Sequence, residues 1–146
     1  MTIKESSDDS IDHIGWWLWR AAMAWKTQFA EEMVQAGHDW YAEARSSVVP
    51  FIGPRGTRQA ELVRRIGLTK QAVQQLVDDL EREGVVVRRP DPNDQRAKIV
   101  VFTEKGMAAR RDAQRIKLAI ESEWRERLGS TDFRELERLL RKIDTD

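Results

Sequence analysis

Cationic side chains gather at one turn of the chain, in the segment DPNDQRAK at residues 91–98. Arg96 and Lys98 stand between two β-branched runs, and Asp94 precedes the arginine by two positions. A guanidinium at the tip of a hairpin fits the narrow, electronegative minor groove of duplex DNA, and we expect Asp94 to hold it in place. The alternative is an ion pair that stabilises the turn, and surface ion pairs contribute little to folding. The neighbouring elements decide between these interpretations.

Two short helices are predicted immediately upstream of this turn. Apolar residues at helical spacing indicate a helix over 58–66, capped by Thr57, and a second helix over 70–83, capped by Thr69. Gly67 ends the first helix and leaves only a short connection to the second. Two helices joined in this way form a helix-turn-helix.

A β-hairpin is predicted to follow at once. The runs VVVRR (85–89) and RAKIVVF (96–102) are rich in β-branched residues, and PDPNDQ (90–95) between them favours a hairpin with a longer loop. The remaining helices are expected at 11–36, at about 40–49 up to Pro50, at 104–128 after a Thr103 cap, and after Ser130 or Thr131 as the last cap. The predicted fold class is mainly α with a small β-hairpin wing (α+β), a winged helix-turn-helix held between other helices.

The second helix of this unit has a polar face that could read DNA. A glutamine amide both donates and accepts, which matches the major-groove edge of adenine. Lysine and threonine side chains suit guanine or phosphates. A solvated polar face would look the same in isolation, but a helix-turn-helix followed directly by a basic hairpin favours DNA. The predicted contact residues are Thr57, Thr69, Lys70, Gln71, Gln74, Gln75, Arg88, Arg89, Asp94, Arg96 and Lys98.

Charge is unevenly distributed along the chain, although the formal net charge is zero. Residues 54–111 carry 13 Lys and Arg against 8 Asp and Glu, whereas residues 1–53 carry 4 against 8. A basic centre between acidic flanks is expected when one lobe faces phosphates. No apolar run approaches the length of a bilayer span, and the polar, acidic start lacks the order of a signal peptide. We therefore expect a cytoplasmic protein with no membrane partner.

Several kinds of site are disfavoured by composition. The chain has no cysteine, and His13 and His38 lack metal-binding spacing, so we expect no disulfide, no metal site and no cofactor. Each histidine is expected at a surface or an interface. The chain has no glycine-rich phosphate loop and no G-x-S-x-G motif, and we therefore nominate no catalytic residue and expect no enzyme.

Residues 56–106 resemble the MarR family of bacterial transcription regulators. The resemblance rests on the polar cap before the second helix and on three runs: LVDDLEREG (76–84), DQRAK (94–98) and TEKG (103–106). It implies an obligate homodimer that binds a pseudo-palindromic operator in double-stranded DNA and usually represses nearby genes. It also implies one domain over 1–146, with a winged lobe at about 39–106 and dimerisation helices at 10–36 and 104–143.

Two positions depart from the family pattern. Gln75 stands where many relatives have arginine, and Asp79 lies where a basic residue is common. Fewer cations at the phosphates imply weaker non-specific binding and a shallower dependence on salt.

Tryptophans crowd the first third of the chain. Their preferred interpretation is core and dimer interface, and the alternative is a pocket for a small aromatic or lipophilic effector, which the family often binds between its lobes. The pocket candidates are Trp16, Trp19, Met23, Arg45 and Ser46. The last helix has an apolar stripe that one small domain cannot bury, which predicts a twofold dimer. The interface candidates are Trp17, Trp124, Phe133, Leu136, Leu140 and Ile143.

Two rival functions fit much of the same pattern. A winged helix can use the same faces to dock a protein without sequence-specific DNA binding, and the zero net charge leaves room for that function. A sensor that has lost DNA binding would keep the tryptophan pocket. Salt dependence and sequence preference separate both from a DNA-binding regulator.

Overall fold

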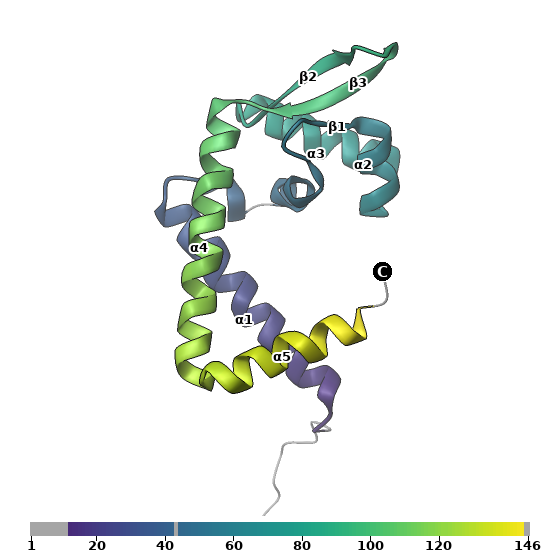
Figure 1. Ribbon diagram of the computed structural model, residues 1–146. Coiled ribbons are helices and arrows are strands. Elements are labelled where there is room, and N and C mark those ends of the chain that lie inside the picture. The colour runs from purple at the N-terminus through teal and green to yellow at the C-terminus, as the bar shows by residue number, and fades with distance from the viewer. Residues whose placement is uncertain (1–11, 43, 145–146) are drawn as a thin grey trace, which may run out of the picture.

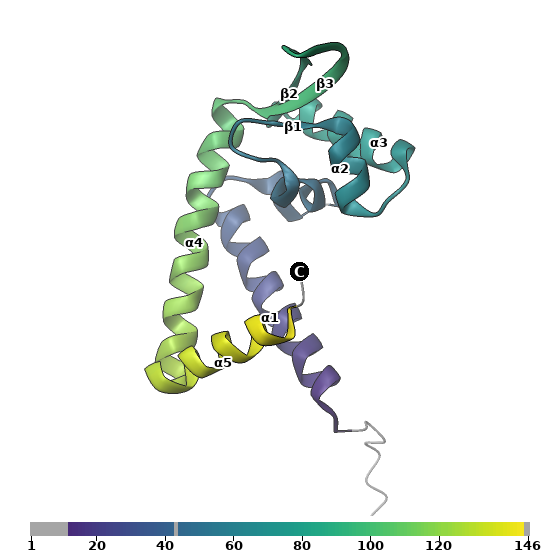
Figure 2. The ribbon, with the colours of Figure 1, turned by 45° about the vertical axis from the view of Figure 1, so that its right-hand side comes forward.

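The computed structural model describes residues 12–42 and 44–144, so the helix starts predicted at residues 10 and 11 lie outside the described part. In chain order the elements are α1 (Ile14–Gln35), the 3-10 helices η1 (Asp39–Ala42) and η2 (Ala44–Phe51), β1 (Thr57–Arg58), α2 (Gln59–Ile66), α3 (Lys70–Arg82), β2 (Val86–Asp91), β3 (Asp94–Phe102), α4 (Glu104–Leu128) and α5 (Ser130–Ile143). The predicted fold class is confirmed. Helix α4 runs from the sheet at one end of the molecule to α5 at the other, and α1 packs along it (Figures 1 and 2).

Helices α2 and α3 form the predicted helix-turn-helix. Leu62 of α2 and Val73 of α3 are fully buried and hold the two helices to the core. Gly67 has a φ of 73°, a left-handed conformation that glycine adopts without strain and that ends α2. Thr69 caps α3 as predicted, because its Oγ1 accepts a hydrogen bond from the N–H of Ala72 at 3.1 Å.

The hairpin turn is tighter than predicted. Strands β2 and β3 pair antiparallel as far as Asp91 opposite Asp94, so the turn consists of residues 92–93 rather than the predicted 90–95. The sheet order is β1-β3-β2, which leaves β2 at an edge. An edge strand can lack one N–H, and Pro90 therefore continues the strand instead of ending it.

Thr57 does not cap α2, contrary to the prediction. It lies in β1, opposite Val100 of β3, and its side chain is buried. Its Oγ1 accepts from the N–H of Gly53 at 2.9 Å and donates to the carbonyl of Phe51 at 3.3 Å. The hydroxyl thus ties the end of η2 to the sheet, and Arg58 takes the N-cap position without a side-chain hydrogen bond.

Helix α5 also begins without the predicted Ser130 or Thr131 cap. Gly129, with a φ of 83°, is the single residue between α4 and α5, and Ser130 is already helical. The connection is too short to place a hydroxyl before the first turn, so Gly129 itself occupies the N-cap position.

The segment predicted as one helix over 40–49 forms the two 3-10 helices η1 and η2, the second of which includes Pro50. His38, which was expected at a surface or an interface, is buried just before η1. Its Nε2 lies 2.8 Å from Oδ2 of Asp112 on α4, and this pairing satisfies the buried imidazole. The hydrogen bond lowers the pKa of Asp112 and keeps its carboxylate ionised.

An apolar stripe on α4 packs against α1. Ile116 and Ile120 are buried and Trp124 is half-buried. At the edge of this contact the side-chain amide of Gln28 on α1 donates to Glu123 on α4 at 2.7 Å. The first helix and the long helix therefore form one support for the rest of the molecule.

The start of α4 is fitted against the end of α3. Thr103 caps α4 as predicted, with its Oγ1 3.2 Å from the N–H of Gly106 and 3.1 Å from the carbonyl oxygen of Val85. A Cβ on Gly106 would collide with that same carbonyl oxygen and lie 2.8 Å from Cδ1 of Phe102. Glycine at 106 therefore permits the close approach that joins the winged lobe to α4.

Replacing Gly106 by alanine is expected to destabilise the protein by about 1–3 kcal/mol, as overpacking does in a well-filled site. The loss should appear although alanine favours a helix interior over glycine by about 1 kcal/mol. Urea unfolding measures the difference. The control is Gly53→Ala, whose Cβ would lie in ordinary contact, 3.6 Å from the nearest atoms. Equal losses in the two variants would contradict the packing argument.

Candidate nucleic-acid interface

The polar residues predicted on α3 share its outward face. All five of them are exposed: Thr69, Lys70, Gln71, Gln74 and Gln75. Helical geometry turns about 100° per residue, which places Gln71 and Gln75 one turn apart and away from the buried Val73 and Val77. The hydroxyl of Thr69 accepts the capping hydrogen bond, so its own proton can still be donated to a phosphate.

One residue of this face is held by its neighbours along the helix. The Nε2 of Gln75 donates to Oδ1 of Asp79 at 3.1 Å. Asp79 in turn forms an ion pair with Arg82. The three side chains make a continuous polar chain along α3.

Arg88 is engaged by the protein itself, which changes the role predicted for it. Its Nε donates to Gln59 of α2 at 2.7 Å, and its guanidinium lies 2.7 Å from Asp78 and 3.6 Å from Glu81 of α3. The same side chain reaches the carbonyl oxygen of Gln74 at 3.4 Å. Arg88 therefore fastens β2 to both helices instead of presenting a free cation to a phosphate.

Arg89 lies on the opposite face of β2, because successive side chains of a strand point to opposite sides. It is exposed, as are Arg96 and Lys98 on β3. Within residues 12–42 and 44–144 these three cations form no ion pair. They are the hairpin's available positive charge.

Asp94 braces the backbone of the hairpin rather than the arginine side chain. Its Oδ1 accepts from the backbone N–H of Arg96 at 3.0 Å, so the expected clamp on the guanidinium is wrong. The fixed turn still orients the strand from which Arg96 projects.

A buried carboxylate at the tip of the hairpin was not among the predicted residues. Asp91 is 3% exposed, forms an ion pair with Arg58 beside α2, and accepts from the N–H of Asn93 at 2.9 Å. An aspartate that bonds the backbone two residues on is a recognised turn signal, and the run Asp91-Pro-Asn carried it. Together Arg58 and Asp91 hold the hairpin against the helix-turn-helix.

The five residues predicted to form an effector pocket do not come together. Trp16 and Trp19 stack on each other with ring centroids 5.3 Å apart and remain exposed. Neither lines the two hollows that include Met23 and Ser46. Arg45 pairs with Glu83 at 3.4 Å.

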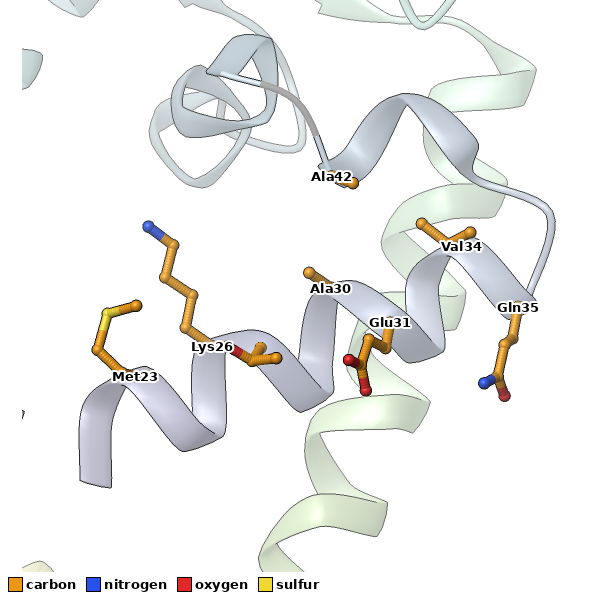
Figure 3. A pocket seen from close by; sticks show the side chains of 8 residues that line it. Met23, Lys26, Ala30, Glu31, Val34, Gln35 and Ala42 are labelled. Carbon is orange, nitrogen blue, oxygen red and sulfur yellow. The ribbon is translucent and has the colours of Figure 1, made fainter. Parts of the chain in front are cut away.

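The other two candidates line separate hollows. Met23 borders a hollow along α1 with Lys26, Ala30 and Ala42, and Figure 3 shows the side chain of Lys26 extending away from α1 between Met23 and Ala30. Ser46 borders a neighbouring pocket of about 470 Å³, a volume typical of ligand sites. That pocket also contains Tyr41 and Lys117. Burial raises the pKa of Tyr41 and keeps its phenol protonated, hence a hydrogen-bond donor.

The predicted interface residues divide into two groups. Phe133 is buried within its own chain, where the guanidinium of Arg125 on α4 lies 4.7 Å from the centre of its ring. Leu136 and Trp124 are half-buried. Trp17 is 52% exposed, and the other exposed members are Leu140 and Ile143.

Two other features bear on the kind of protein. In the described residues, no cluster of three or more histidines, aspartates and glutamates is placed to share a metal ion. No helix there is both long and apolar enough to cross a bilayer.

Arg88 and Arg89 are expected to respond differently to mutation. Replacing Arg88 by alanine removes charged hydrogen bonds that link three elements and should lower stability by about 1–3 kcal/mol. Replacing the exposed Arg89 should change stability by less than about 0.5 kcal/mol. Urea unfolding of the two variants tests the assignment, and equal stability of both would overturn the anchoring role of Arg88.

Comparison with known proteins agrees with this geometry. The MarR family matches residues 48–97 of the chain, which span the helix-turn-helix and most of the hairpin. Over 73 residues the chain is 29% identical to an uncharacterised protein of Mycobacterium tuberculosis (strain H37Rv), and it spans about half the length of that curated relative.

The fold is similar to solved structures over most of its length. CouR from Rhodococcus jostii RHA1, bound to p-coumaroyl-CoA, is 29% identical, with a TM-score of 0.67 over 90% of this chain and 92% of that one. The repressor CouR bound to a 23-mer DNA duplex is 26% identical, with a TM-score of 0.69 over the same shares. MarR from E. coli, at 23% identity, shares the fold with a TM-score of 0.71 over 92% of this chain and 98% of its own. In its winged helix-turn-helix and in the long helix that carries it, this chain is similar to the MarR family of DNA-binding transcription regulators.

Proposed function

We propose that the protein is a homodimeric repressor that binds a pseudo-palindromic operator through α3 and the β2–β3 hairpin. The observation that carries this proposal is the pairing, in one lobe, of an exposed polar helix face with three free hairpin cations, Arg89, Arg96 and Lys98. The helix is expected to enter the major groove while Arg96 reaches the adjacent minor groove. Similarity to the DNA-bound repressor CouR supports this arrangement. Such a regulator would act in the cytoplasm.

A dimer would cover the apolar surface at the opposite end of the molecule. Trp17 and Leu18 of α1, Leu118 of α4, and Leu140 and Ile143 of α5 are between 41% and 68% exposed. Several large apolar side chains exposed at one end of a molecule favour an interface there. In this proposal the ends of the chain, 10–36 and 104–143, dimerise, and the lobe at about 39–106 binds DNA. A twofold axis would then present two copies of α3 to half-sites roughly 34 Å apart.

An effector would act by changing the distance between the two winged lobes of the dimer. The pocket containing Tyr41, Ser46 and Lys117 lies where α1, η2 and α4 meet. An occupant would therefore contact η2 of the winged lobe and the dimerisation helices α1 and α4. We place a small aromatic or lipophilic ligand there rather than at Trp16 and Trp19. The ligand-bound structure of CouR, with p-coumaroyl-CoA, supports a ligand-responsive regulator. Regulation requires that the ligand bind the DNA-competent and incompetent spacings with different affinity.

A protein-docking winged helix remains the second candidate, because the formal net charge is zero and α3 carries three glutamines but only one lysine on its outward face. Binding of DNA weakens steeply with salt because counterions are released. Docking of a protein to the same face predicts neither that slope nor a preference for a DNA sequence.

Binding to a DNA fragment from upstream of the protein's own coding region is expected to depend on Arg96. Arg96→Ala should weaken binding about tenfold and flatten the salt dependence by about two units of slope, one for each subunit of the dimer. Fluorescence anisotropy at several salt concentrations measures both quantities. The control is Arg64→Ala on α2, an exposed arginine beside Glu61 that lies outside the predicted contacts. Equal weakening by both substitutions would mean that the effect comes from the loss of one positive charge per chain, and it would contradict a specific contact of Arg96 with DNA.

Dimerisation is expected to depend on the exposed face of α5. Leu140→Asp should raise the dimer dissociation constant by about tenfold or more, because the interface would bury an unpaired carboxylate. Light scattering across a dilution series measures the change. Leu68→Asp is the matched control, since Leu68 is 47% exposed, close to the 43% of Leu140, but lies in the winged lobe. A monomeric wild type, or an unchanged Leu140→Asp dimer, would contradict the proposed interface.

A further inference from the structure

The polar chain Gln75–Asp79–Arg82 on α3 contributes little to the stability of the fold. Gln75 is exposed, and the side chain of Asp79 is 30% exposed. Polar pairs one turn apart on a helix stabilise it only slightly. Its position is what distinguishes it: Gln75 lies on the outward face of α3, next to Gln71, where a base edge would be read.

The chemistry of Asp79 fixes which way the amide of Gln75 points. An ionised carboxylate can only accept hydrogen bonds, so Gln75 must turn its NH₂ group toward Asp79, as the 3.1 Å contact requires. One N–H is then occupied. The carbonyl oxygen Oε1 and the second N–H remain available on the outward side.

This remaining pair of groups is a defined recognition pattern. One acceptor beside one donor is complementary to the N6 amino group and N7 of adenine in the major groove. Guanine offers two acceptors there, N7 and O6, which cannot satisfy the glutamine oxygen. A glutamine free to rotate would match adenine less strongly, because its ordering would oppose binding.

Arg82 offsets the repulsion that the Asp79 carboxylate would otherwise exert on the phosphates of DNA. Its guanidinium, one turn further along α3, pairs with Oδ1 of Asp79, the same oxygen that accepts the hydrogen bond from Gln75. The pair carries no net charge, so Asp79 can orient Gln75 without adding an uncompensated negative charge beside the phosphates. Asp78, the adjacent carboxylate, is directed instead to Arg88 of β2 at 2.7 Å.

We propose that Asp79 is a positioning residue for base specificity, which orients the amide of Gln75 to select an A·T pair at one symmetric position in each operator half-site. The inference rests on the proposed DNA-binding function and deepens it. It assigns a task to both positions at which the chain departs from the family pattern. Gln75 reads the base, and Asp79 restricts how it reads.

The test begins with selection of a binding sequence by the wild-type protein from randomised double-stranded DNA. Each position of the selected duplex is then changed in turn, and affinities are measured for wild type, Gln75→Ala, Asp79→Ala and the double variant. In the wild type, replacing the critical A·T pair by G·C should weaken binding roughly 5- to 150-fold. Gln75→Ala should abolish this penalty at that position alone.

Asp79→Ala should reduce the same penalty by roughly 2- to 12-fold, which corresponds to releasing one side chain that had been held in place. The double variant should resemble Gln75→Ala. Glu61→Ala on α2 is the control, since it removes a carboxylate that pairs with Arg64 and Arg65 outside the predicted contacts, and it should leave the base preference unchanged. A merely structural role for Asp79 would alter affinity for all sequences equally and would not move this preference.

Three results would overturn the inference. The penalty could persist unchanged in Asp79→Ala, or Gln75→Ala could leave every base preference intact, and in both cases the wild type would still select a sequence and remain a DNA-binding regulator. If the wild type selects no sequence at low salt, the proposed function fails together with the inference. The selection step therefore separates the two failures.

Discussion

The close contact of Gly106 with the backbone of Val85 is the constraint on which the rest of the structure depends. At this point the end of α3, the start of β2 and the first turn of α4 meet, and Thr103 closes the junction by bonding to Val85. A side chain at 106 would push α4 away from the lobe. Because α4 also packs along α1 and carries α5, this junction links the apolar end to the hairpin, while a second set of contacts runs from α1 through η1 and η2 to α3 (Figure 1).

Some cations of the winged lobe form ion pairs that hold the hairpin in place, and others are exposed to solvent. Arg58 and Arg88 pair with carboxylates and fix the hairpin on the helices. Arg89, Arg96 and Lys98 stay exposed on the same hairpin. A hairpin held only by the hydrogen bonds between its own strands would be mobile relative to the helices. Its cations would then lose conformational entropy on binding, which weakens the interaction. The zero net charge of the chain is thus compatible with a local basic surface.

Buried and exposed apolar side chains lie in different parts of the molecule. The buried core lies under the helix-turn-helix and between α1 and α4, whereas all the large exposed apolar side chains of the described residues except Leu68 lie on α1, α4 and α5. The aromatic stack of Trp16 on Trp19 belongs to this exposed group. The hollow near Tyr41 lies between the two regions, and its polar groups, including Lys117, come from different helices. An occupant there would be well placed to couple them.

The sequence by itself determined the features that depend on near neighbours along the chain. Caps at Thr69 and Thr103, the stop at Gly67 and the polar face of α3 follow from residues within a few positions of one another. Only the tertiary structure decided what depends on distant partners. Adjacent arginines at 88 and 89 look alike in sequence, yet one faces Gln59 and Asp78 while the other faces solvent. Thr57 became a buried strand residue, and His38 found Asp112, 74 positions away. Capping and periodicity are local energies, whereas burial and ion pairing are set by which elements the completed fold brings together.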